Sequence, residues 1–316
     1  MKEYVYGKTP CFLESTWAVD KNPRGADVLV YGVPWEGGVT WGDYTGVELG
    51  PKSMRLASAR YSGYLPELDH IDVFEHLKLA DMGDVDVIPA EIDNTMKRIT
   101  SFSAQVWGSG KFPVALGGDH SITYPILKAW SDENPSKRLG IIHLDAHYDN
   151  MPHFQGDKYA RNTPFARLYE LDGVRNESLL HVGIHGPRNK PESGRYAQEA
   201  GAKTLTINDI REGGDLRTLA NDIYEQASEG TDAVYLSVCS DVLDHAFNPG
   251  GPVDANGLSS YELLTLIYEF GKRGLCGMDF VEVYPQQDAT DFSSHLASTV
   301  ILYVLAGHAR RDSTST

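Results

Sequence analysis

Short apolar runs, many of them rich in β-branched residues, alternate along the chain with longer stretches in which apolar residues return every three or four positions. The short runs predict buried strands, and the periodic stretches predict helices that bury one face. Strands are expected at residues 27–33, 112–118, 138–147, 178–184, 202–209, 232–238 and 275–283, and helices at residues 89–107, 121–132, 214–228, 259–273 and 292–308.

The repeated order of strand, helix and strand sets the expected fold class. It predicts an α/β protein with a mostly parallel sheet that carries helices on both faces. Because no stretch rich in proline and glycine divides the chain, we expect a single domain over residues 1–309. Residues 310–316 are polar and are expected to form a disordered tail. In such a sheet, ligands bind outside the carboxyl ends of the strands.

Composition and charge narrow the classes of function. Of 316 residues, 44 are acidic and 28 are basic, which gives a formal net charge of −16. Phosphate backbones and anionic membrane surfaces repel such a chain, so neither nucleic acid nor a membrane is an expected partner. The sequence shows no signal-like pattern and no run of about 18 apolar residues, and its three cysteines are far apart. We therefore expect a cytoplasmic protein without disulfides that acts on a small molecule.

Side chains that bind metals follow the predicted strands. His120 comes just after the second strand, and the third strand ends in Asp145, His147 and Asp149, which occupy alternate positions. Alternate side chains of an extended segment point the same way, so these three groups can converge on one point. Buried carboxylates beside a histidine require a counter-cation, which favours a metal site.

Two further strand ends supply groups of the same kind. Cys239 and Asp241 alternate after the sixth strand, and Glu282 lies near the end of the last one. Two histidines with several carboxylates suit a pair of divalent ions such as Mn²⁺, Ni²⁺, Co²⁺ or Zn²⁺. Two such ions lower the pKa of a shared water toward neutrality and supply a hydroxide nucleophile. The pattern therefore predicts a metal-dependent hydrolase.

The same motifs resemble those of the ureohydrolase family, which includes arginases and agmatinases. The resemblance runs nearly end to end, with GGDHS at residues 117–121, DAHYD at residues 145–149, and further matches at residues 32–38, 50–51, 55, 182–184 and 282–283. It implies a three-layer αβα sandwich around a mostly parallel eight-stranded sheet. It also implies trimers or hexamers, two ions of manganese or nickel, and hydrolysis of a C–N bond in a guanidino or amidino compound.

The resemblance also assigns roles to individual residues. The expected metal ligands are His120, Asp145, His147, Asp149, Cys239 and Asp241. Catalysis is assigned to Glu282 and Asp149, and substrate binding to Arg161, Asn162 and Glu282, whose carboxylate suits the N–H donors of a planar cation.

Two of the residues with assigned roles depart from the family pattern. Cys239 stands where relatives have a bridging aspartate; a thiolate there favours nickel or zinc over manganese, and a neutral thiol weakens one metal site. Arg161 stands where relatives have the histidine credited with proton transfer, and arginine cannot serve as a base near neutral pH. Its positive charge opposes a guanidinium substrate unless another carboxylate compensates. Glu36 and Glu48 stand where relatives usually show aspartate and arginine.

These departures leave several functions open. The chain is an active amidinohydrolase for a guanidine- or biguanide-like compound, or a hydrolase of an anionic formimino compound whose carboxylate Arg161 holds. Alternatively, it is a catalytically impaired subunit that joins an active ureohydrolase-like chain in a hetero-oligomer, and in this it resembles the auxiliary subunits of two-component enzymes such as metformin hydrolase. A ligand-binding or mononuclear-metal protein on the same scaffold is a fourth interpretation.

Overall fold

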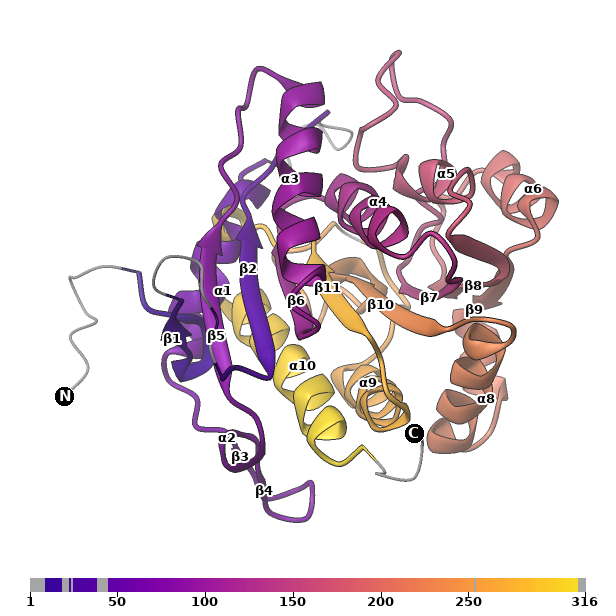
Figure 1. The fold of residues 1–316 in the computed structure, drawn as a ribbon. Helices are drawn as coiled ribbons and strands as arrows, with labels where there is room; N and C mark the ends of the chain where they lie inside the picture. Colours follow the sequence, from indigo (N-terminus) through magenta and orange to yellow (C-terminus); the bar gives the residue numbers. More distant parts are fainter. Residues whose placement is uncertain (1–8, 19–22, 24, 39–44, 253, 312–316) are drawn as a thin grey trace.

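A parallel sheet forms the centre of the computed structural model, which describes residues 9–18, 23, 25–38, 45–252 and 254–311 (Figure 1). Within these residues the sheet has nine strands in the order β1-β5-β2-β6-β11-β10-β7-β8-β9. The strands are β1 (Thr16–Trp17), β2 (Val28–Val33), β5 (Leu79–Asp84), β6 (Phe112–Gly117), β7 (Leu139–Leu144), β8 (Val174–Ile184), β9 (Lys203–Thr206), β10 (Ala233–Cys239) and β11 (Gly277–Val281). Every neighbouring pair in this sheet is parallel.

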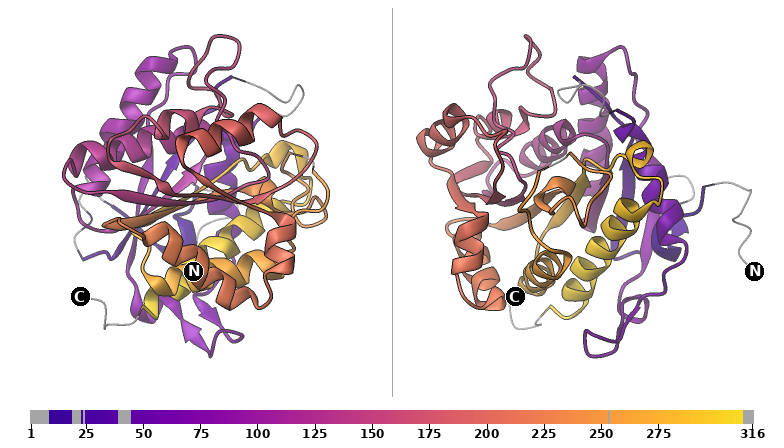
Figure 2. Two further views of the ribbon diagram at one scale, coloured as in Figure 1. Left: turned by 90° about the vertical axis from the view of Figure 1, so that its right-hand side faces the viewer. Right: turned by 180° about the vertical axis from the view of Figure 1, so that it is seen from behind.

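Helices cover both faces of the sheet, which Figure 2 shows edge-on in its left view. Helices α3 (Ile92–Trp107) and α4 (Thr123–Glu133) lie on one face, and α8 (Leu216–Ser228), α9 (Ser260–Arg273) and α10 (Phe292–Ala309) lie on the other. The shorter helices are α1 (Gly50–Ser58), α2 (Val73–His76), α5 (Pro164–Leu168), α6 (Pro191–Ala200) and α7 (Ile207–Glu212). Strands β3 (Tyr64–Leu65) and β4 (Ile71–Asp72) form a separate antiparallel pair.

The two helical layers enclose two hydrophobic cores. Val28 and Val30 of β2 pack into the core beneath α8, α9 and α10, whereas Leu29 and Tyr31 pack into the core beneath α3 and α4. Both faces of the strand are therefore buried. This explains why the strands appear in the sequence as continuous apolar runs rather than as alternating patterns.

The expected parallel sheet between two helical layers is confirmed, but within the described residues this sheet has nine strands where eight were expected. The sequence pattern misses β1 and β5 because β1 has only two residues and β5 contains Asp81. This carboxylate is fully buried and accepts hydrogen bonds from Arg55 Nε at 2.8 Å and Nη2 at 2.9 Å. The ion pair with Arg55 allows Asp81 to be buried in the strand. Because Asp81 interrupts the apolar run, the hydrophobic pattern does not predict this strand.

Several predicted strand boundaries also differ from the structure. The strand expected at residues 202–209 ends at Thr206, because Thr206 and Asp209 form a capping box that starts α7. Helix α10 ends at Ala309, and most of the tail expected at residues 310–316 lies outside the described residues. Within the described ranges, no helix has both the length and the apolar character that crossing a bilayer requires.

Candidate metal centre

The predicted metal ligands lie at the ends of β6, β10 and β7, and Glu282 directly follows β11, which lies between β6 and β10. Strands β6, β11, β10 and β7 are adjacent and parallel, so their carboxyl ends meet at one edge. His120 opens a short 3₁₀ turn after β6, and Asp119 caps this turn by accepting a hydrogen bond from the Ser121 amide. A Cβ atom on Gly118 would lie 2.0 Å from the Trp35 carbonyl oxygen, so only glycine allows the chain to pass there.

The first ligand cluster surrounds the His120 ring. His120 Nδ1 lies 3.0 Å from Asp145 Oδ2 and 3.0 Å from Asp149 Oδ2, and its Nε2 lies 3.0 Å from Ser237 Oγ. Cys239, which is 1% exposed, offers its sulfur to the same cluster as His120 and Asp145, with all three ligand atoms within 4.8 Å of one another. Ser237 in turn donates to Asp279 Oδ1 at 2.7 Å, which fixes the far side of the imidazole.

The second cluster shares Asp145 with the first. Asp145, His147 and Asp241 bring one ligand atom each to within 4.8 Å of the others, and all three are buried. His147 Nδ1 lies 3.0 Å from Asp241 Oδ2 and 3.5 Å from Asp145 Oδ1. The Ala146 amide donates to Asp241 Oδ1 at 3.1 Å. The structure therefore brings all six expected ligands together as two adjoining groups with a common carboxylate.

Three buried residues that the sequence reasoning missed hold these ligands in place. Asp254 Oδ2 lies 3.0 Å from His147 Nε2 and sets the orientation of that ring. His143 Nε2 lies 2.9 Å from Asp145 Oδ2, and His143 Nδ1 lies 2.7 Å from His181 Nδ1. The position of His143 two residues before Asp145 is a signal that could have revealed it, since both point to the same side of the strand. Asp254 lies in a loop and has no such signal.

Both assigned catalytic residues have a strained backbone conformation. Asp149 has φ 43° and Glu282 has φ 65°, both in the left-handed region that residues with a Cβ atom rarely occupy. The Glu282 amide donates to the Gly118 carbonyl at 2.9 Å, and Ser240 Oγ donates to the Glu282 carbonyl at 2.5 Å. Such strain persists only where surrounding contacts impose it, and it is typical of functional sites.

The charges and donors of the two clusters fit divalent cations. His120 Nδ1 is fully buried, and among the described residues it has no hydrogen bond of acceptable geometry even though two carboxylates lie nearby. Burial and the neighbouring Asp145 together raise the pKa of Asp149 to about 6. Burial, together with the charge of Asp145, also holds the pKa of the Cys239 thiol well above its usual range. A cation would stabilise every one of these anions, so the six side chains fit a pair of borderline divalent ions.

Glu282 lies next to the first cluster and is already paired. Its Oε1 accepts a hydrogen bond from the His120 amide at 2.8 Å, and its Oε2 lies 3.3 Å from Arg161 Nη1. Arg161 and Glu282 both contact the Tyr284 hydroxyl. Burial raises the pKa of Glu282 to about 7, while Arg161 opposes this shift. Two of the three residues assigned to substrate binding, Arg161 and Glu282, are thus in contact with each other.

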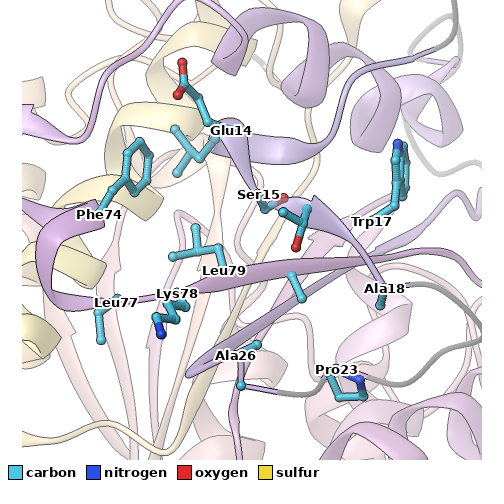
Figure 3. Close-up of a pocket in the computed structure, with 14 residues that line it drawn as sticks. Glu14, Ser15, Trp17, Ala18, Pro23, Ala26, Phe74, Leu77, Lys78 and Leu79 are labelled. Atoms are coloured by element: carbon cyan, nitrogen blue, oxygen red, sulfur yellow. The ribbon is translucent and has the colours of Figure 1, made fainter.

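A cavity of about 230 Å³ opens beside the second cluster. Its lining includes the ligands His147 and Asp149, the expected substrate residue Asn162, and the cations Arg188 and Lys190. A second cavity, of about 500 Å³, lies at the β1–β5 edge of the sheet between Glu14, Trp17 and Lys78 (Figure 3). Strands β5 and β2 separate that edge from β6. The smaller cavity is therefore the one that a substrate of the metal centre would enter.

A parallel α/β sheet whose central strand ends gather two histidines, three carboxylates and a cysteine is typical of a metal-dependent hydrolase. Residues 26–307 match the sequence profile of the Arginase family. The chain therefore belongs to the arginase family of guanidino and amidino hydrolases.

Individual relatives agree with this assignment. The chain is 32% identical to a guanidinopropionase of Pseudomonas aeruginosa over 92% of this chain and 90% of the relative. It is also 32% identical to a formimidoylglutamase of Halalkalibacterium halodurans, over 92% of this chain and 93% of the relative. The solved structure of proclavaminate amidinohydrolase from Streptomyces clavuligerus superposes on this chain with a TM-score of 0.87 at 31% identity. The match covers 96% of this chain and 98% of the chain of that structure.

Proposed function

We propose that the chain hydrolyses a C–N bond of a small linear amidine with the help of two divalent metal ions, of which manganese and nickel are the first candidates. The observation that supports this most directly is the pair of buried ligand clusters joined by Asp145. A carboxylate shared by two ligand groups suits two ions held close together. When bound, such ions supply a nucleophile by lowering the pKa of water.

The protein's own residues supply the remaining functions. His120, Asp145 and Asp149 would hold one ion, with Cys239 beside them, and Asp145, His147 and Asp241 would hold the other. Arg161 cannot move a proton near neutral pH. Burial raises the pKa of Glu282 to about 7, so this carboxyl group is suited to hold or release a proton, whereas Asp149 would stay ionised as a ligand of the bound ion.

The cavity favours a substrate with a carboxylate at its far end. Arg188 Nη1 lies 3.8 Å from Asp254 Oδ2, and Asp254 contacts His147, so this cation lies close to the second cluster. Lys190 lines the same cavity. A guanidino acid or a formimino acid could place its amidine carbon at the metal ligands and its carboxylate at these cations. The relatives named guanidinopropionase and formimidoylglutamase support this class.

Metal content and turnover of the chain purified alone test the proposal. After growth with manganese and nickel supplied, elemental mass spectrometry is expected to find two ions per chain. We also expect hydrolysis of a guanidino or formimino acid to be faster than hydrolysis of the amine of equal length, with Arg188→Ala reducing this preference. One ion or none in the active protein would refute the two-metal mechanism. If wild type and Arg188→Ala prefer the acid over the amine to the same extent, the proposed binding of the substrate carboxylate at Arg188 is refuted.

One observation favours a second candidate, an auxiliary subunit of a hetero-oligomeric amidinohydrolase such as metformin hydrolase. The ion pair between Arg161 and Glu282 occupies the carboxylate expected to bind a guanidinium or biguanide substrate. In this case the chain would associate with an active ureohydrolase-like chain. Light scattering and activity of the chain, alone and mixed with such a partner, distinguish the two candidates, because an auxiliary subunit is active only in the mixture.

A further inference from the structure

The Glu282 carboxylate is bound to a guanidinium group that belongs to the protein itself. Arg161 Nη1 lies 3.3 Å from Glu282 Oε2 and contacts the Tyr284 hydroxyl, and Arg161 Nη2 lies 3.2 Å from Glu36 Oε1. The Arg161 side chain is 2% exposed, and its guanidinium carbon lies 5.7 Å from the centre of the Tyr284 ring. Glu36, Glu282 and Tyr284 thus surround one planar cation, and we call these three residues the guanidinium niche.

The niche is built for a cation and not for an anion. Besides Glu36 and Glu282, the fully buried Asp119 also acts electrostatically on Arg161, so three carboxylates face one positive charge. Asp119 itself is held by the amides of Gly37 at 2.6 Å and Ser121 at 3.0 Å. Removing the cation would leave buried carboxylates without a counter-charge, which is strongly unfavourable. A substrate carboxylate in the niche would be repelled by these carboxylates.

Backbone contacts fix the segment that carries Arg161. The Met151 amide donates to the Asn162 carbonyl at 2.9 Å, and the Thr163 amide donates to the Ala160 carbonyl at 3.0 Å. The Phe165 amide donates to the carbonyl of the metal ligand Asp149 at 3.0 Å. Asn162 and Phe165, which follow Arg161, are therefore tied to residues 149–151, and the side chain of Arg161 enters the niche from a fixed position.

We propose that Arg161 is a specificity-determining residue whose own guanidinium fills this niche and thereby excludes guanidinium groups of ligands from Glu282. The inference rests on the proposed function in one respect, because the excluded guanidinium compounds are candidate substrates of the same site. It explains how the chain keeps Glu282 buried and Glu36 paired without a substrate cation. It also predicts that the amidine of a true substrate lies against the metal ligands without pairing with Glu282.

Truncation of the side chain tests the inference through binding rather than turnover. Arg161→Ala removes the guanidinium group of the protein and leaves a space of that shape, which still favours a cation. We expect the metal-loaded variant to bind guanidinium or methylguanidinium about tenfold more tightly than wild type, since a charge-assisted pair is regained. Isothermal titration calorimetry at constant ionic strength measures the affinity, and urea, which has the same shape without the charge, is the control ligand.

A double variant locates the bound ion. In Arg161→Ala combined with Glu282→Gln, the gain in guanidinium affinity is expected to disappear, whereas Arg161→Ala combined with Arg188→Ala keeps it. The inference is overturned if wild type binds guanidinium as tightly as Arg161→Ala, or if urea binds equally well. Because these assays measure only binding, a chain that proves inactive leaves the result interpretable.

A measurement on the wild-type protein covers the case in which Arg161→Ala does not fold. Phenylglyoxal modifies accessible arginines, and peptide mapping by mass spectrometry gives the extent at each one. Arg161 is expected to remain unmodified while Arg188, whose side chain is 33% exposed, reacts. Equal modification of both residues would show that Arg161 leaves the niche readily, and this would overturn the inference.

Discussion

Asp241→Asn separates the metal-binding role of the second cluster from its contribution to folding. Asp241 is 2% exposed, and burial together with the charge of Asp145 raises its pKa, so the ionised carboxylate is unfavourable without a cation. Asparagine keeps an oxygen for the Ala146 amide and presents an N–H to His147 Nδ1. We therefore expect the metal-free variant to be as stable as wild type or more stable.

In contrast, the stabilisation of the protein by added metal is expected to be smaller in Asp241→Asn than in wild type. A ligand at about one hundred times its dissociation constant stabilises a protein by about 2.7 kcal/mol. For a chain of this size, that corresponds to a rise in the thermal midpoint of several degrees. Loss of the ion in the Asp241 cluster should remove most of this increment, because the remaining ligands there are Asp145 and His147.

Differential scanning calorimetry with and without manganese or nickel measures both effects, and elemental analysis gives the stoichiometry. Asp244→Asn is a matched control, since Asp244 lies three residues further on and accepts bonds from the Ala246 and Asn256 amides rather than from metal ligands. The control should keep the full metal-dependent rise. If Asp241→Asn also keeps it and binds as many ions as wild type, our assignment of Asp241 is wrong.

Three further substitutions test separate parts of the structure. Asp254→Asn weakens the orientation of His147 and should lower metal affinity about 10–100-fold in competition with a chelator, whereas unchanged affinity would exclude a positioning role. Cys239→Asp replaces a soft ligand with a hard one and should shift bound metal from nickel or zinc toward manganese in mixed-metal loading; an unaltered ratio would place Cys239 outside the site. Arg55→Ala leaves Asp81 buried without its cation and should cost about 3–5 kcal/mol in urea unfolding, while a loss below 1 kcal/mol would contradict this reasoning.

The sequence alone determined the framework of the fold and indicated which metal-binding side chains gather at one edge of the sheet. Continuous apolar runs separated by periodic stretches are local features, and they predicted the central strands and the principal helices. The ligands could be predicted because parallel strands end at the same edge, so residues just after β6, β7, β10 and β11 had to meet once these strands became neighbours.

The tertiary structure decided which distant side chains form pairs. Arg161 meets Glu36 across 125 residues and Glu282 across 121, and His147 meets Asp254 across 107. The order of strands in the sheet differs from their order in the chain. Local patterns in the sequence do not predict which loops this order places next to each other. The sequence showed that an arginine had replaced a histidine, but only the packing of the loops showed that this arginine neutralises Glu282. Local patterns determine which elements form, whereas burial and pairing of charges depend on contacts made after those elements assemble.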